Sequence, residues 1–193
     1  GAIDRTRKLI EAMNKRGGDK EVMTLAQVNL GRMSFQKAKY KDSLDAYQKV
    51  GKDNSLWIQS LTEQGWAQIQ VKDAAGAIGN MHSIQSPYFD NVYKPESYVV
   101  RSIGYLNICQ YADSAKTLAY LDQFYGPLVE KTENFVKNHS EDAIYKGVLQ
   151  FISSKQKIEM DGLPKAVTVE VARQRDFLNT QETLNGLVDE ANA

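Results

Sequence analysis

The feature that most constrains this chain is an internal repeat with intervals of 34 and then 37 residues. Apolar and aromatic side chains recur in one order in three copies: Tyr40, Tyr47 and Val50; Ala74, Met81 and Ile84; Tyr111, Leu118 and Leu121. Smaller residues follow the same register at Gly31, Gly65 and Ser102. The three extra residues fall between Ile84 and Tyr98, where prolines indicate a loop. Such intervals are typical of arrays of short helical units.

Each copy has the pattern of two helices joined by a short turn. Apolar residues return every three or four positions, which is the helical period, and no hairpin signal for strands occurs. The expected pairs are 24–38 with 40–50, 57–70 with 74–84, and 98–108 with 112–124. Gly126-Pro127 should end the last helix, because proline disfavours a helical conformation in the residue before it. The sequence therefore predicts an all-α fold.

Residues outside the three copies also have helical patterns. We expect helices at 3–15, 128–137, from the N-cap Ser140 to about Met160, and from Pro164 to Ala191. This gives three regions. They are a flanking helix at 1–18, which could remain from an earlier repeat, three repeats at 19–127 (about 22–55, 56–89 and 93–127), and a helical cap at 128–193.

The first copy resembles the tetratricopeptide repeat (TPR). Leu30-Gly31, Tyr40, Ser43, Tyr47 and Val50 stand at that family's signature positions. The later copies depart from it, with Gln64 for the signature leucine and Arg101-Ser102 for Leu-Gly. The turn glycine is replaced by Ala38, Lys72 and Cys109. The resemblance implies a TPR-like right-handed solenoid of helical hairpins with extra C-terminal helices.

The resemblance also implies a concave groove, lined by the first helix of each pair, that holds an extended or helical segment of another protein. The candidates for this groove are Asn29, Arg32, Phe35, Gln36, Glu63, Trp66, Gln70, Val99, Ile103 and Asn107, with Ile69, Val100 and Leu106 beside them. Arg32 is the expected anion contact. Val28, Glu63 and Glu96 stand where carboxylate-clamping members carry lysine or asparagine, which disfavours a clamp for chain termini.

Composition and motifs favour binding over catalysis. Lysine plus arginine and aspartate plus glutamate number 24 each, and no apolar run is long enough to span a membrane. His82, His139 and Cys109 stand apart from any catalytic or metal-binding motif. We therefore expect no enzyme activity, no metal and no cofactor, and a non-catalytic scaffold that binds another protein.

Several alternatives stay open. The groove could be covered by the chain's own C-terminal helix, through Val171, Phe177, Leu178, Leu184 and Val188, or its side chains could be core between hairpins. The protein could be a helical accessory subunit of an enzyme. It could also bind nucleic acid weakly through residues 1–54, which hold 12 basic and 7 acidic side chains, although the neutral total favours no nucleic acid.

A weaker resemblance concerns the loop and helix that follow the second copy. Ser86-Pro87-Tyr88-Phe89, Pro95-Glu96 and the stretch 105–111 are similar to bacterial TPR proteins of gliding and predatory proteobacteria. That resemblance implies a bacterial envelope, motility or polarity complex. A single cysteine suits either the cytoplasm or the periplasm. Because the chain starts Gly1-Ala2, we expect it to be a piece of a longer protein.

Overall fold

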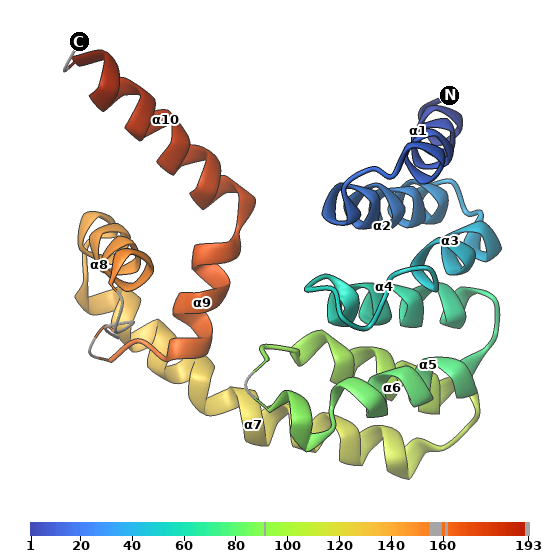
Figure 1. Ribbon diagram of the computed structural model, residues 1–193. Helices are drawn as coiled ribbons and strands as arrows, with labels where there is room; N and C mark the ends of the chain where they lie inside the picture. Colours follow the sequence, from blue (N-terminus) through green and yellow to red (C-terminus); the bar gives the residue numbers. More distant parts are fainter. Residues whose placement is uncertain (91, 155–159, 161, 192–193) are drawn as a thin grey trace. The chain divides into compact units, whose positions relative to one another are not determined.

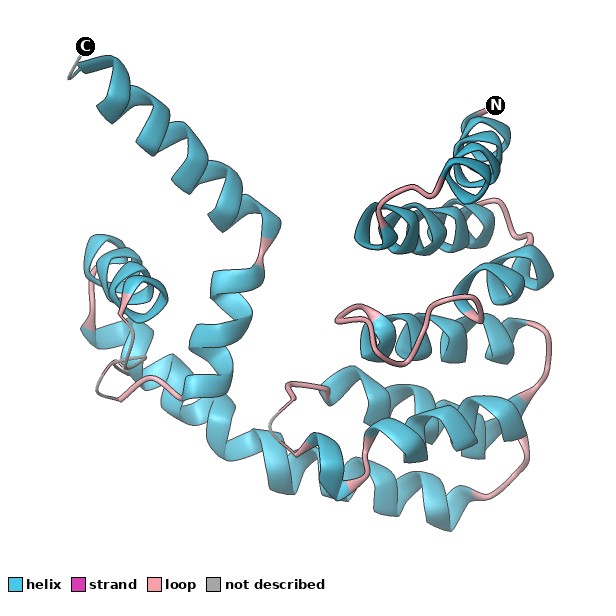
Figure 2. Ribbon diagram, viewed as in Figure 1, coloured by secondary structure: helices cyan, strands magenta, loops and turns pink. Residues whose placement is uncertain are grey.

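The computed structural model describes residues 1–90, 92–154, 160 and 162–191 (Figure 1). Within these residues every regular element is helical, which confirms the all-α prediction (Figure 2). The helices are α1 (Ala2–Arg16), α2 (Lys20–Gln36), α3 (Tyr40–Tyr47), α4 (Trp57–Gln70), α5 (Ala74–Ile84), η1 (Pro87–Phe89), α6 (Pro95–Asn107), α7 (Tyr111–Asn138), α8 (Glu141–Ser153), α9 (Lys165–Arg173) and α10 (Arg175–Ala191).

The chain divides into two compact units. The first contains residues 1–90 and 94–121, and the second contains the described residues among 91–93 and 122–193. In the first unit each helix packs against the next one along the chain from α1 to α6, and α4 also contacts α2 and α6. In the second unit α9 packs against both α8 and α10.

The turns within the three helix pairs of the first unit have the same backbone geometry. Ala38, Lys72 and Cys109 have φ values of 57°, 64° and 60°, and they are the non-glycine residues with positive φ among those described. A left-handed conformation costs an L-residue about 1–2 kcal/mol. The residue after each one donates its N–H to a carbonyl five positions earlier, at 2.9 Å in all three turns. The chain thus builds one turn three times, at intervals of 34 and 37 residues.

The small residues of the repeat register lie where two helices approach closely. A Cβ atom on Gly31 would be 2.5 Å from the Tyr47 ring, and one on Gly65 would be 2.8 Å from Met81 Cε. In the third pair, Ser102 Oγ instead lies 2.7 Å from Ser114 Oγ. In the first two pairs a large side chain of the second helix therefore packs against a glycine of the first. In the third pair a hydrogen bond joins the two helices at the same position.

Two clusters of buried side chains form the core of the first unit. One joins α2, α3 and the segment after α3, through Val28, Tyr47 and Val50. The other joins α4, α5 and α6, through Leu61, Ala77, Met81, Ile84 and Val100. Trp57 packs against both clusters and so connects them.

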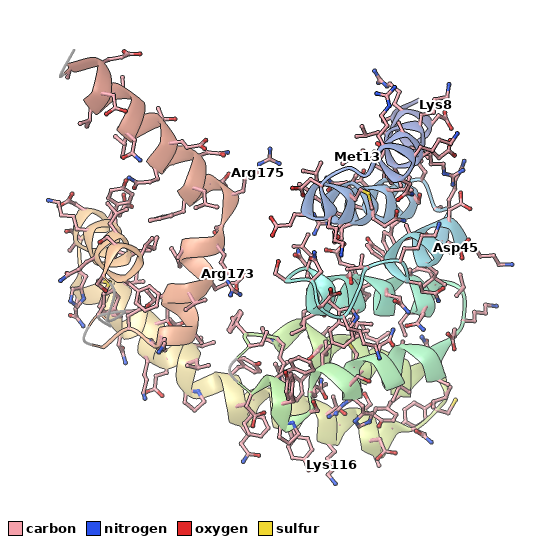
Figure 3. The ribbon with its side chains drawn as sticks, in the orientation of Figure 1. Lys8, Met13, Asp45, Lys116, Arg173 and Arg175 are labelled. Atoms are coloured by element: carbon pink, nitrogen blue, oxygen red, sulfur yellow. The ribbon has the colours of Figure 1, made fainter. Side chains whose placement is uncertain are left out.

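Helix α1 extends the first unit at its N-terminal end. It ends at Gly17, whose φ of 68° is the left-handed conformation that glycine adopts without strain. Met13, half-buried, lies against Gly18 at the junction with α2 (Figure 3). Arg7 bonds to Asp42 of α3 at 2.8 Å.

The prediction that a helix ends at Gly126-Pro127 is wrong, because α7 runs from Tyr111 to Asn138 with Pro127 inside it. A proline inside a helix removes one hydrogen bond and costs about 3 kcal/mol or more. The residues beyond it offset that cost, since Phe135 is buried and Leu128 half-buried. The predicted separate helix at 128–137 is therefore the second half of α7.

The single long helix predicted from Pro164 to Ala191 is also wrong. Gln174 is extended, with ψ 136°, and separates α9 from α10. Arg173 and Arg175 flank the break (Figure 3), and this polar stretch has no buried side chain to hold a continuous helix. The predicted N-cap is confirmed, since Ser140 accepts a hydrogen bond from the Ala143 N–H. Helix α8 ends at Ser153, and residues 155–159 of its expected extension lie outside the described residues.

Candidate functional site

The candidate groove residues lie on the first helix of each pair, α2, α4 and α6, and we call this surface the first-helix face. None of the ten principal candidates is buried. The exposed ones carry side-chain amides: Asn29, Gln36, Gln70 and Asn107. The half-buried ones are Arg32, Phe35, Glu63, Trp66, Val99 and Ile103.

Arg32 and Glu63 form an ion pair that joins α2 to α4. The Arg32 guanidinium donates to both carboxylate oxygens, with Nε 2.9 Å from Oε2 and Nη2 2.5 Å from Oε1. The Tyr47 hydroxyl donates to the same Oε2 at 2.8 Å. The hydrogen bond to Glu63 raises the pKa of Arg32. Burial, and next the Glu63 charge, raise the pKa of Tyr47. The expected anion contact therefore already has a counter-charge within the chain.

A second link of the same kind joins α4 to α6. The Trp66 indole N–H donates to Glu96 Oε1 at 2.6 Å. The residue is half-buried, and its ring also packs against the core cluster of α4, α5 and α6. Trp66 stands 34 positions after Arg32, so the two residues occupy the same position of the repeat. Each donates a hydrogen bond to the first helix of the following pair.

The apolar part of the first-helix face is smaller than the sequence predicts. Val100 is fully buried against Leu61 and Met81, so its assignment to the groove is wrong and it belongs to the core. Phe35 packs edge-on against the Tyr40 ring at 5.2 Å between ring centroids. Leu106 is exposed, whereas Ile69 is half-buried against the core. What α6 adds to the face is therefore a short edge of Val99, Ile103 and Leu106.

The first-helix face can bind a partner through hydrogen bonds rather than through a net charge. A side-chain amide donates and accepts, so it can pair with the backbone of an extended peptide. The Arg32–Glu63 pair leaves no excess positive charge there. The face is suited to a polar segment with a few apolar side chains.

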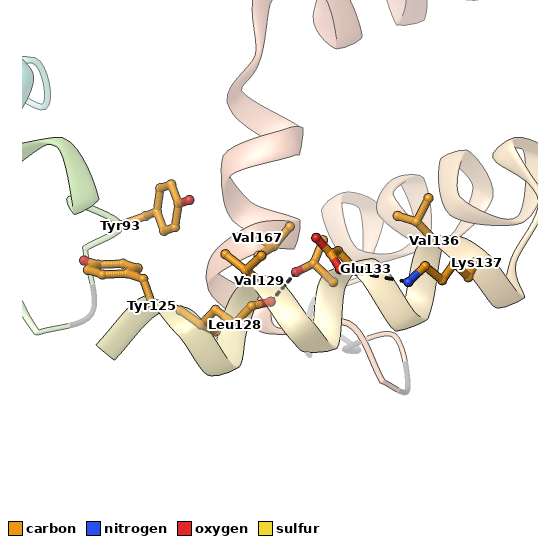
Figure 4. Close-up of a pocket in the computed structure, with 9 residues that line it drawn as sticks. Tyr93, Tyr125, Leu128, Val129, Glu133, Val136, Lys137 and Val167 are labelled. Carbon is orange, nitrogen blue, oxygen red and sulfur yellow. Dashed lines mark hydrogen bonds and ion pairs between the residues drawn. The ribbon is translucent and has the colours of Figure 1, made fainter. Parts of the chain in front are cut away.

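The second unit has a hollow that sequence reasoning missed. Its volume is about 400 Å³, and its lining is mostly apolar (Figure 4). It follows α7 through Tyr125, Leu128, Val129, Thr132 and Val136, with Tyr93 and Val167 beside them. The Tyr93 and Tyr125 rings meet edge to face, 5.6 Å between centroids. The three- and four-residue spacing along α7 could have revealed this stripe, but the predicted break at Pro127 divided it.

The residues considered for catalysis lie apart. His82 contacts Arg101 and Tyr105 in the first unit, and His139 stacks on Phe135 in the second. Cys109 is exposed at the third turn. Within the described ranges, no three His, Cys, Asp or Glu side chains come together as a metal site would require. Among the same residues, no helix has the length and apolar character of a membrane span.

Comparison of the chain with protein-family models, with curated proteins and with solved structures finds no match.

Proposed function

We propose that this protein is a non-catalytic scaffold in which three TPR-like hairpins stack as a right-handed solenoid and bind a segment of another protein on the first-helix face. The hairpins are α2–α3, α4–α5 and α6–α7. The stacking proposal is supported by the three equivalent left-handed turns and by the small side chains at three equivalent positions, Ser43, Ala77 and Ser114, all buried.

The observation that carries the binding proposal is the pair of links between successive first helices. Arg32 to Glu63 and Trp66 to Glu96 hold α2, α4 and α6 side by side while neighbouring amides stay exposed. A row of fixed helices with exposed donors and acceptors is suited to an extended or helical segment, because the helices lose little conformational freedom on binding. The setting in a bacterial envelope, motility or polarity assembly rests on the similarity of residues 86–111 alone.

Site-specific photo-crosslinking tests this proposal. A photoreactive amino acid replaces Gln70 on the first-helix face, or as a control Asp45, which is exposed on α3 (Figure 3). We expect a discrete partner that crosslinks from Gln70 and not from Asp45, and that is lost in the additional variant Arg32→Glu. Equal labelling from both positions would contradict binding on this face.

A purified partner then permits a quantitative test. Gln36→Ala and Asn107→Ala each remove an exposed amide while leaving the helices intact. Each should weaken binding about threefold to tenfold, as loss of one net hydrogen bond does. Unchanged affinity in both variants would indicate that the partner binds elsewhere.

A further inference from the structure

A buried positive charge occupies a core position of the third helix pair. Arg101 stands 37 residues after Gln64 and 71 after Leu30, both of which are buried. It is 8% exposed. Burying a charge that lacks a counter-charge costs several kcal/mol, so such residues are normally paired. The same position thus carries leucine, then an amide, then a cation.

Among the described residues, Thr117, His82 and Tyr98 lie around the guanidinium of Arg101, and none of them carries a carboxylate. Its Nε donates to Thr117 Oγ1 at 3.3 Å, its Nη1 lies 3.3 Å from His82 Nδ1, and its Cζ lies 5.5 Å from the centroid of the Tyr98 ring. No carboxylate in the part of the chain that the structure describes forms an ion pair with it. A guanidinium has five donors, and these contacts use two of them.

His82 connects this charge to solvent. The side chain is exposed, and its Nε2 lies 3.0 Å from the Tyr105 hydroxyl. Because Arg101 can only donate, the Nδ1 that it approaches must accept, which places the proton of the neutral ring on Nε2. Burial, and next the charge of Arg101, lower the pKa of His82.

The ionisable groups around Arg101 are tyrosines and a lysine, and the carboxylate of Asp90 acts on Tyr98. From α6 they are Tyr98 and Tyr105, and from α7 Tyr120, with Lys116 Nζ 5.8 Å from the centroid of its ring. The groups that act electrostatically on Arg101 are tyrosines, and Arg101 is the one that acts on His82. The cluster therefore has a positive charge and spare donors, and its His82 side chain is exposed to solvent.

We propose that Arg101, His82 and Tyr105 form a binding site for a compact oxyanion, either a phosphate group or a carboxylate. The spare donors of Arg101 match the geometry of a planar or tetrahedral oxyanion. The Tyr105 hydroxyl supplies a further donor. An anion beside His82 favours the charged form of its ring, so anion binding raises the pKa of His82. The added proton goes to Nδ1, and it replaces the hydrogen bond that this atom accepts from Arg101 Nη1. This site lies apart from the residues of the proposed first-helix face.

Histidine NMR tests the site with an internal control, because His82 and His139 are the two histidines of the chain. The probes are sulfate, whose charge is constant over the titration and which represents phosphate chemistry, and acetate, which represents a carboxylate. Chloride at equal ionic strength is the reference. We expect sulfate, acetate or both to raise the pKa of His82 and to leave that of His139 unchanged. A His82 titration that neither anion moves relative to chloride would overturn the proposal.

Two variants test whether the anion-dependent change in the pKa of His82 depends on Arg101 and Tyr105. Arg101→Gln should abolish the anion-dependent change at His82, and persistence of that change would contradict the proposal. Tyr105→Phe, which keeps the ring, should weaken anion binding about threefold to tenfold through the lost hydrogen bond. If Arg101→Gln does not fold, Tyr105→Phe decides the question, because unchanged affinity there would exclude the site.

Discussion

The second and third helix pairs of the first unit share a register and a turn, yet they are packed by opposite chemistries. Between α4 and α5 the central contact is apolar, with Met81 fully buried over Gly65, and one hydrogen bond from Asn80 to Gln68 lies beside it. Between α6 and α7 it is polar, with Ser102 bonded to Ser114 and Arg101 to Thr117. The third-copy equivalent of Met81 is Leu118, which is 47% exposed.

Helix pairs with the same turn and register can therefore be stabilised by different kinds of contact. Buried apolar area supplies most of the favourable free energy of folding, whereas a hydrogen bond contributes about 1 kcal/mol net. The third pair should therefore open before the second in partial unfolding. Its polar interior also leaves room for a charge that an apolar pair would exclude.

The largest expected effect contrasts the equivalent residues Met81 and Leu118. Met81→Ala removes a fully buried side chain and should lower the free energy of unfolding by about 2–5 kcal/mol. Leu118→Ala removes a half-exposed side chain and should cost less than about 1 kcal/mol. Urea denaturation followed by circular dichroism measures both values. Similar costs would show that the third pair is as tightly packed as the second.

An intermediate effect contrasts two glycines of the second pair. A Cβ at Gly65 would lie 2.8 Å from Met81 Cε and 2.9 Å from Val100 Cγ1, whereas Gly79 has no atom within 4 Å. Gly65→Ala should destabilise by about 1–2 kcal/mol, because overpacking exceeds the gain in helix propensity. Gly79→Ala should stabilise by about 0.5–1 kcal/mol, since only the propensity changes. Thermal unfolding distinguishes them, and a stabilising Gly65→Ala would disprove the close contact.

The smallest effect concerns what the pairs have in common. Replacing Ala38, Lys72 or Cys109 with glycine relieves a left-handed residue, and should stabilise each turn by about 0.5–1 kcal/mol after glycine's greater chain entropy is subtracted. Ala119→Gly, at an exposed position inside α7, is the control and should destabilise by about 1 kcal/mol. Hydrogen exchange localises the gain. A loss of stability in the three turn variants would refute the shared geometry.

The sequence predicted the elements best where the repeat supplied independent evidence. The bounds predicted for α4 and α5 agree with the structure, because apolar spacing, turn position and register all coincide there. One prediction that rested on a single local signal, the helix stop at Gly126-Pro127, failed. Gly126-Pro127 is a helix stop in isolation, but burial of Phe135 beyond it holds α7 together.

The sequence assigned the candidate residues to the first helix of each pair, but it did not predict the contacts that they make. The resemblance to the TPR family, carried onto this sequence, selected the face that carries Arg32 and Trp66. Spacing cannot show that each side chain is bonded to the next first helix, because those contacts depend on how the helices stack. Val100 was assigned to the face together with Val99, but one residue along a helix is a rotation of about 100°, which places Val100 in the core. The cluster around Arg101 needed three helices to be placed together, which no local pattern indicates.

The three turns have a consequence for recognising such chains. An alanine, a lysine and a cysteine hold one backbone conformation at Ala38, Lys72 and Cys109. A comparison that scores residue identity finds nothing to align at these positions. A comparison of backbone dihedral angles aligns all three at once. Repeats of this kind can therefore differ in residue type while they keep the same backbone conformation. They are best searched for by their backbone dihedral angles.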